Sequence, residues 1–196
     1  MILSMELQNF TAFTSAKLQF GKQLNVIVGE HGSGKSHLLK LLYSALAASW
    51  EEGRKPNAQP PTEARLQLAL ADKLLGVFRP GSLGQLVRQK TRGGRCQARL
   101  RFDRVGQDLA FGFSAQSKAE IELEAAPKQW LAAPPVFLPG RELLTLYPGF
   151  RSLNEGQQLE FEETWRDTCR LLGAPLLRED PKVESSSSIC SSRLRS

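Results

Sequence analysis

The residues best suited to chemistry lie together near the N-terminus, in the sequence GEHGSGKS at positions 29–36. This stretch fits the pattern G-x-x-x-x-G-K-S, the Walker A motif, in which glycines let backbone N–H groups turn inward around a phosphate. We expect Lys35 to reach the β- and γ-phosphates of a nucleotide and the Ser36 hydroxyl to ligate Mg²⁺. The residues of this phosphate loop that are predicted to bind the nucleotide are Gly29, Glu30, His31, Gly32, Ser33, Gly34, Lys35 and Ser36.

The phosphate loop is flanked by the elements that such a site requires. Residues 24–28 form a short apolar run that predicts a strand entering the loop, and apolar residues at helical spacing predict a helix over 36–50. The same patterns predict further strands at 2–7, 17–20, 96–102, 109–115, 119–124 and 135–138, and further helices at 63–78, 142–153 and 161–172. Helices combined with a run of three alternating segments predict an α/β protein with an antiparallel meander.

Length and composition indicate one globular domain. The chain has 196 residues, 41% hydrophobic and 23% charged, so it can bury a core without disulfides. Its three cysteines are far apart and support neither a disulfide framework nor a zinc site. No apolar run approaches the ~20 residues that span a bilayer, and no basic residue precedes Lys17, so we expect a cytoplasmic protein without membrane contact. The serine-rich tail, residues 179–196, is predicted to be disordered.

Positive charge is concentrated in one part of the chain. Residues 79–104, here called the basic segment, hold eight lysines and arginines against one acidic residue, Asp103. This segment would attract an acidic partner such as a nucleic acid. The same charges are also compatible with a solvated surface, because no aromatic residue that could stack on bases lies among them before Phe102. Both interpretations stay open.

A second acidic motif for hydrolysis is not evident. An ATPase needs an apolar strand that ends in Asp, but the run Leu68–Asp72 lies inside a helical pattern. Asp103–Gly106 has the D-x-x-G form found in GTPases, but no guanine-specific element follows, and a turn explains it. Residues 153–157 match the LSGGQ signature at three of five positions and are expected to form a loop. We therefore expect little nucleotide turnover by this chain.

Three stretches of the chain resemble one family. MELQNFTAF (5–13), LNVIVGEHGSGKSHLLKLL (24–42) and VFLPGRELLTLYPGF (136–150), extended by 161–177, are similar to prokaryotic AAA-family ATPases with an ABC-type head related to SMC and RecF proteins. The resemblance implies the fold class: an α/β P-loop NTPase, specifically an ABC-type ATPase head lobe with an antiparallel β subdomain plus helices. It spans residues 1–178, predicted as the ATP-binding domain, and implies ATP and Mg²⁺ as cofactors.

The resemblance also implies roles for residues outside the phosphate loop. Such heads place a γ-phosphate contact after the strand that would end at Leu138, which makes Arg141 and Glu142 candidate sensors or, alternatively, a surface ion pair or helix cap. Asn9, Phe10 and Phe13 lie where such heads approach the adenine or ribose.

The family's second half would carry the signature helix, the acidic strand and a switch histidine, none of which is found in the sequence. The resemblance therefore implies that the chain is the N-terminal part of a head. Hydrolysis would then require the C-terminal half and head-to-head pairing in a homodimer. The alternative is a non-catalytic, nucleotide-binding interaction module that presents the basic segment to a nucleic acid or another polyanion.

Overall fold

The N-terminus forms a long β-hairpin. The computed structural model describes residues 1–56, 58–88, 93–139 and 162–173. Within them β1 (Ile2–Phe10) pairs antiparallel with β2 (Phe13–Gln19), in a register that runs from Ser4 opposite Gln19 to Phe10 opposite Phe13. The hairpin is closed by a two-residue tip, where Thr11 adopts a positive φ of 45°. This tip lies close to the phosphate loop, since a Cβ on Gly34 would be 3.1 Å from the Ala12 Cβ.

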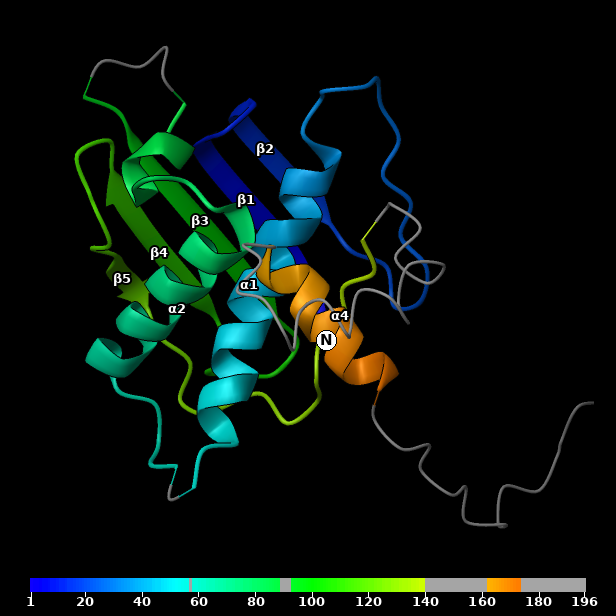
Figure 1. Ribbon diagram of the computed structural model, residues 1–196, viewed down its shortest axis with the longest axis vertical. Helices are drawn as coiled ribbons and strands as arrows, with labels where there is room; N and C mark the ends of the chain where they lie inside the picture. The colour runs from blue at the N-terminus through cyan, green and yellow to red at the C-terminus, as the bar shows by residue number, and fades with distance from the viewer. Residues whose placement is uncertain (57, 89–92, 140–161, 174–196) are drawn as a thin grey trace, which may run out of the picture.

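Five strands form one antiparallel sheet in the order β2-β1-β3-β4-β5 (Figure 1). After the hairpin the chain forms α1 (Lys35–Gly53), α2 (Glu63–Phe78) and a 3₁₀ turn, η1 (Leu83–Leu86), before β3 (Arg95–Phe102) returns beside β1. The meander then continues through β4 (Leu109–Ser114) and β5 (Glu122–Ala125). The helices that separate β2 from β3 are thereby placed against the sheet.

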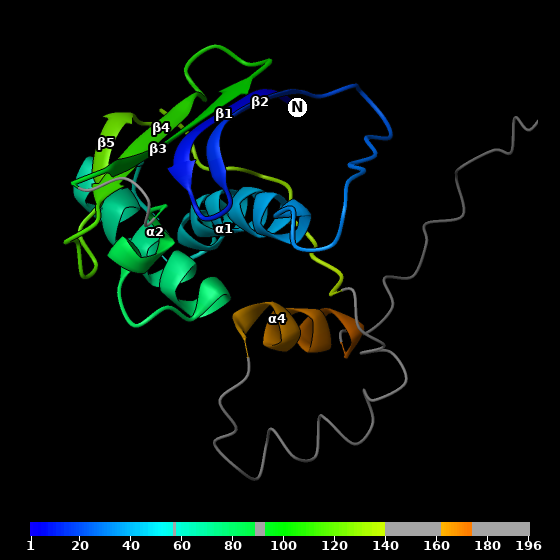
Figure 2. The same cartoon turned by 90° about the horizontal axis from the view of Figure 1, so that it is seen from above.

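The elements stack in layers, as Figure 2 shows: the sheet, then α1 and α2 on one of its faces, then α4 (Glu163–Leu172) on the far side of these helices. Alternate side chains of the strands point into the core, while the apolar stripes of the two helices close it. Fully buried core residues include Met5, Leu7, Phe10, Leu41, Leu66, Leu70, Leu74, Leu100, Phe111 and Phe113. Burial of each such leucine contributes about 1.5–3 kcal/mol, so the apolar stripes hold α1 and α2 on the sheet.

Most predicted elements are confirmed, and two strands are wrong. The helices at 36–50, 63–78 and 161–172 correspond to α1, α2 and α4, and all three meander strands form, although β5 is short. Residues 24–28 and 135–138, predicted as strands, have no regular secondary structure and belong to no sheet. A short apolar run is a local signal, whereas a strand also needs a hydrogen-bonding partner from elsewhere in the chain. The predicted helix at 142–153 and the tail lie outside the described residues.

In the described parts of the chain, no helix is both long and apolar enough to cross a membrane.

The contact between η1 and the β4–β5 turn leaves no room for a side chain at Gly84. A Cβ there would lie 2.1 Å from the backbone oxygen of Ala115, and the Gly84 N–H donates a 2.9 Å hydrogen bond to Ser117. We expect Gly84→Ala to lower the free energy of unfolding in urea by about 1–3 kcal/mol. Gly81→Ala is the control, because its Cβ would meet only the flexible Gln85 side chain. Equal stability of the two variants would contradict this packing.

Candidate functional site

The phosphate loop leads directly into α1. Gly34 is the N-cap of the helix with a left-handed φ of 93°, and its carbonyl accepts a 3.1 Å hydrogen bond from the Leu38 N–H. Lys35 and Ser36 are therefore the first two helical residues. The first N–H groups of a helix have no partner within it and carry the positive end of the helix dipole. This end of α1 is suited to bind an anion such as a phosphate.

The ammonium group of Lys35 is directed into the loop that precedes it. Its Nζ donates hydrogen bonds of 2.7 Å to the Gly29 carbonyl and 2.6 Å to the Glu30 carbonyl, and lies 3.3 Å from the Ser33 hydroxyl. The Ser33 N–H donates to the Glu30 carbonyl, which closes the turn. The loop thus gathers a cation and the start of a helix at one point, the charge pattern that a polyphosphate needs.

The hairpin tip supports the loop from behind. A Cβ on Gly34 would lie 2.7 Å from the Phe13 ring and 3.1 Å from the Ala12 Cβ. Gly34 is required here for two independent reasons, its left-handed backbone and this close approach. Its position next to the tip could not be read from sequence, because residues 12–13 and 34 meet only through the packing of the hairpin on α1.

The three residues predicted to approach the adenine or ribose, Asn9, Phe10 and Phe13, have different surroundings in the structure. Phe10 is fully buried and packs edge-on against Phe78, with ring centroids 5.6 Å apart, so it belongs to the core. The Asn9 amide donates to the Arg95 carbonyl at 3.3 Å and ties β1 to β3. Phe13 lies against the phosphate loop, where a Cβ on Gly34 would meet its ring.

A cavity of about 550 Å³ lies beside the first turn of α1. Its walls come from the hairpin tip, α1, α2 and the segment after α2: Thr11, His37, Phe78, Gln85, Leu86, Val87 and Arg88. The Arg88 guanidinium donates to the Ala12 carbonyl, so this cation is held at the tip. Burial, together with the charge of Lys40, lowers the pKa of His37. Arg88 and His37 are 51 residues apart and only the fold brings them to one cavity, so their sequence pattern gave neither an individual role.

Comparison with known proteins matches this part of the chain. A family model described as an AAA domain matches residues 4–125, from β1 to β5, with the phosphate loop inside the match. The chain belongs to this AAA domain family. Over 106 residues it is also 30% identical to structural maintenance of chromosomes protein 6 of Schizosaccharomyces pombe, a match that covers 50% of this chain but 9% of that protein.

Family membership and the similarity to this SMC protein both support a nucleotide-binding ATPase head region. The five-stranded antiparallel sheet with helices on one face fits an AAA domain of this kind. The prokaryotic branch stays a prediction, since the relative is a fission yeast protein. Arg141 and Glu142 lie outside the described residues, so their roles also stay predictions.

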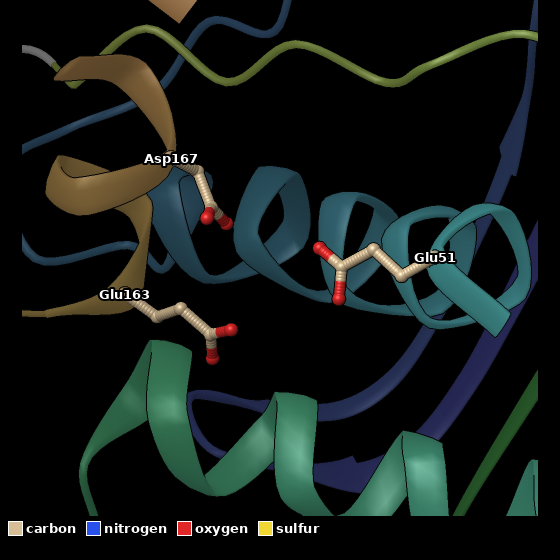
Figure 3. Close-up of side chains that lie close together, drawn as sticks. All are labelled: Glu51, Glu163 and Asp167. Atoms are coloured by element: carbon tan, nitrogen blue, oxygen red, sulfur yellow. The ribbon is translucent and has the colours of Figure 1, made fainter. Parts of the chain in front are cut away.

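Three carboxylates lie together at the C-terminal end of α1. Among the described residues, they are the group whose geometry could hold a metal ion. Figure 3 shows Glu51 of α1 pointing toward Glu163 and Asp167 of α4. The ammonium of Lys73, a residue of α2 that is 3% exposed, lies between them, 2.6 Å from Glu51, 2.7 Å from Glu163 and 3.5 Å from Asp167. A cation is therefore already supplied by the protein.

The Lys73 cluster, which consists of Lys73 and these three carboxylates, attaches α4 to the rest of the AAA domain protein. The Tyr43 hydroxyl donates to Asp167, and the Thr168 hydroxyl donates 2.7 Å to the Phe137 carbonyl. The buried residues of α4 are Thr164 and Thr168. Polar contacts thus hold this helix in place, and the cluster was not predicted from the sequence because its members come from three separate helices.

The basic segment is partly neutralised by its neighbours. Two arginines of β3 reach over β4 to glutamates of β5. Arg95 lies 2.6 Å from Glu122, and Arg99 lies 3.4 Å from Glu124. Arg101 and Arg104 are exposed, whereas Lys90 and Arg92 lie outside the described residues. The charge available to an acidic partner is therefore smaller than the sequence suggests.

Proposed function

We propose that this chain binds ATP with Mg²⁺ at the phosphate loop, as the ATP-binding part of an ABC- or SMC-like ATPase head. The observation that carries the proposal is the left-handed Gly34 cap, which starts α1 at Lys35 and turns the lysine ammonium into the loop. The β- and γ-phosphates would take hydrogen bonds from this ammonium and from the first N–H groups of α1.

The Mg²⁺ role of Ser36 fits the geometry of the loop. Ser36 is exposed on the first turn of α1, next to Lys35. Mg²⁺ in nucleotide sites keeps several waters and takes other ligands from the phosphates. It therefore needs few protein ligands, and the Ser36 hydroxyl could be one of them. The ion would neutralise charge on the phosphates, while the protein orients them.

Hydrolysis is proposed to need more than this chain contains. The apolar run Leu68–Asp72 ends in an aspartate, as the Mg²⁺-binding strand of an ATPase does. In the structure this run lies within α2 and is not a strand. We propose that residues 1–178 form the ATP-binding domain and that turnover requires a C-terminal half and head-to-head pairing of two such heads. The match covers 9% of the fission yeast relative. An ATPase activity like that of a complete head is therefore part of this proposal and not a finding.

The proposal predicts a specific loss in the variant Lys35→Ala. Removing one charge-assisted contact of about 1.5–3 kcal/mol should weaken Mg-ATP binding about tenfold to one-hundred-fold. Isothermal titration calorimetry of the wild type and the variant measures this directly.

Lys55→Ala is the matched control, because Lys55 is exposed just beyond the other end of α1 and should leave ATP affinity unchanged. Equal affinity of Lys35→Ala and the wild type would contradict the site. Separately, ATP turnover by this chain that Lys35→Ala abolishes would contradict the need for a C-terminal half.

A further inference from the structure

The tip of the β1–β2 hairpin is held by the residues that end η1 and follow it. These residues are called the 86–88 segment. The Thr11 N–H donates a 2.8 Å hydrogen bond to the Leu86 carbonyl, and the Arg88 N–H donates a 3.0 Å hydrogen bond to the Asn9 carbonyl. Two main-chain bonds therefore join this segment to the end of β1.

The backbone of the tip is strained. Asn9 and Thr11 have positive φ angles of 51° and 45°, and a β-branched residue such as Thr11 rarely adopts this conformation. Phe10, between them, is fully buried and forms an antiparallel bridge with Val87. Strained backbone of this kind persists only where surrounding contacts hold it. The shape of the tip therefore depends on the 86–88 segment.

One side chain of this segment reaches the residue that lies against the phosphate loop. The Arg88 guanidinium donates to the Ala12 carbonyl, one residue beyond the main-chain bond at Thr11. Ala12 and Phe13 are the residues next to Gly34, where an added Cβ would lie 3.1 Å from the Ala12 Cβ and 2.7 Å from the Phe13 ring. Arg88 is thus connected to the phosphate loop through the hairpin tip.

We propose that Arg88 is a positioning residue of the phosphate loop. By binding the Ala12 carbonyl, its guanidinium holds the tip against Gly34 and keeps residues 29–36 in the conformation that takes phosphate. The effect on nucleotide affinity rests on the proposed Mg-ATP site. An arginine suits this task, because its guanidinium stays charged and hydrogen bonds from a charged donor are about twice as strong as neutral ones.

Hydrogen exchange without nucleotide, followed by NMR, tests the positioning directly. The Leu38 amide donates to the Gly34 carbonyl and the Ser33 amide to the Glu30 carbonyl, so these two amides report how well the loop is held. Arg88→Met removes the donors but keeps a long side chain. Both amides should then exchange about threefold to tenfold faster, the factor that loss of one hydrogen bond gives, with no change in the middle of α2. Unchanged exchange at both amides would overturn the proposal.

Two further variants separate position from charge. Arg104→Met is the matched control, because Arg104 is an exposed arginine of the same basic segment, and it should leave both amides unchanged. Arg88→Lys keeps a charged donor for the Ala12 carbonyl and should restore part of the protection. Equal acceleration in Arg88→Met and Arg104→Met would overturn the proposal.

Calorimetry with Mg-ATP measures the consequence for binding. Arg88→Met should raise the dissociation constant about threefold to tenfold at unchanged stoichiometry. A residue that only stabilised the fold would lower the fraction of chain that binds and leave the affinity of the rest unchanged. Wild-type affinity in Arg88→Met would therefore contradict positioning.

Phe13→Leu distinguishes action through the tip from direct contact of Arg88 with the nucleotide. If Arg88 acts through the tip, Arg88→Met combined with Phe13→Leu should bind no more weakly than the weaker single variant. A direct contact would multiply the two losses, and that result would overturn the proposal. If the wild type binds no Mg-ATP, the proposed function fails, whereas the exchange rates without nucleotide still support or overturn the positioning of the loop.

Discussion

Replacing Lys73 with methionine should lower the free energy of unfolding by about 3 kcal/mol. The methionine keeps the volume of the side chain, so the change isolates the charge. Removing one partner of a buried ion pair costs about 3–5 kcal/mol, and the half-exposed Glu51 places this site at the lower end of that range. Because Glu163 and Asp167 then lose their cation, we also expect faster hydrogen exchange of the α4 amides. Urea unfolding and hydrogen exchange measure the two effects.

The pH dependence of this stabilisation has a definite sign. Burial opposes the charge of Lys73, but the hydrogen bonds to Glu163 and Glu51 outweigh it, and the pKa of Lys73 is raised. The contribution is therefore fully present below the unfolded lysine value of about 10.4 and lost as pH rises through the raised folded value. The gap between wild type and Lys73→Met should persist from pH 7 to 9 and shrink above that range. Lys55→Met, at an exposed site, should show no gap, and a gap independent of pH would contradict the assignment.

Gly34→Val should disable the phosphate loop and destabilise the chain by about 2–5 kcal/mol. A left-handed backbone costs a side chain about 1–2 kcal/mol, and collision with the Phe13 ring adds about 1–3 kcal/mol. Relief of the collision would move Lys35 and the start of α1, so we expect ATP affinity to fall below detection. Urea unfolding and calorimetry with Mg-ATP report the two losses.

Two other glycines allow the cost of the left-handed backbone to be measured without a steric collision. Gly32 and Gly93 also have positive φ, 76° and 70°, but a Cβ on either meets nothing within 4 Å. Gly32→Ala and Gly93→Ala should therefore cost only the backbone strain, and Gly93→Ala should leave ATP binding intact. If Gly34→Val is no less stable than Gly93→Ala, the contact with the hairpin tip does not constrain the loop.

The sequence predicted those features that local periodicity encodes. The apolar stripe of α2 predicted a helix over 63–78, and the structure begins and ends it at those residues. The glycines of the Walker A pattern predicted a tightly turned backbone before the helix, and Gly32 and Gly34 do have positive φ; that residues 29–36 bind a phosphate stays a prediction. The turn predicted at Asp103–Gly106 also forms, with Gly106 at a φ of 78°.

What the sequence could not supply depends on long-range contacts. Residues 24–28 and 135–138 are short apolar runs of the kind found in buried strands, but the described residues provide no neighbouring strand for them. Lys73 lies on the buried face of α2, three residues after Leu70 and four before Val77, which was a usable signal of an unusual lysine. Its carboxylate partners come from α1 and α4, 22 and 90 residues away, and no spacing rule connects them.

The most direct test of the central claim is calorimetric titration of the whole chain with Mg-ATP and, separately, with AMP. A site built from the phosphate loop and the start of α1 takes its affinity from the β- and γ-phosphates, which AMP lacks. We expect Mg-ATP to bind at least about tenfold more tightly than AMP, and Lys35→Ala to remove most of that difference. Equal binding of the two nucleotides, or no binding of either, would contradict a phosphate site at residues 29–36.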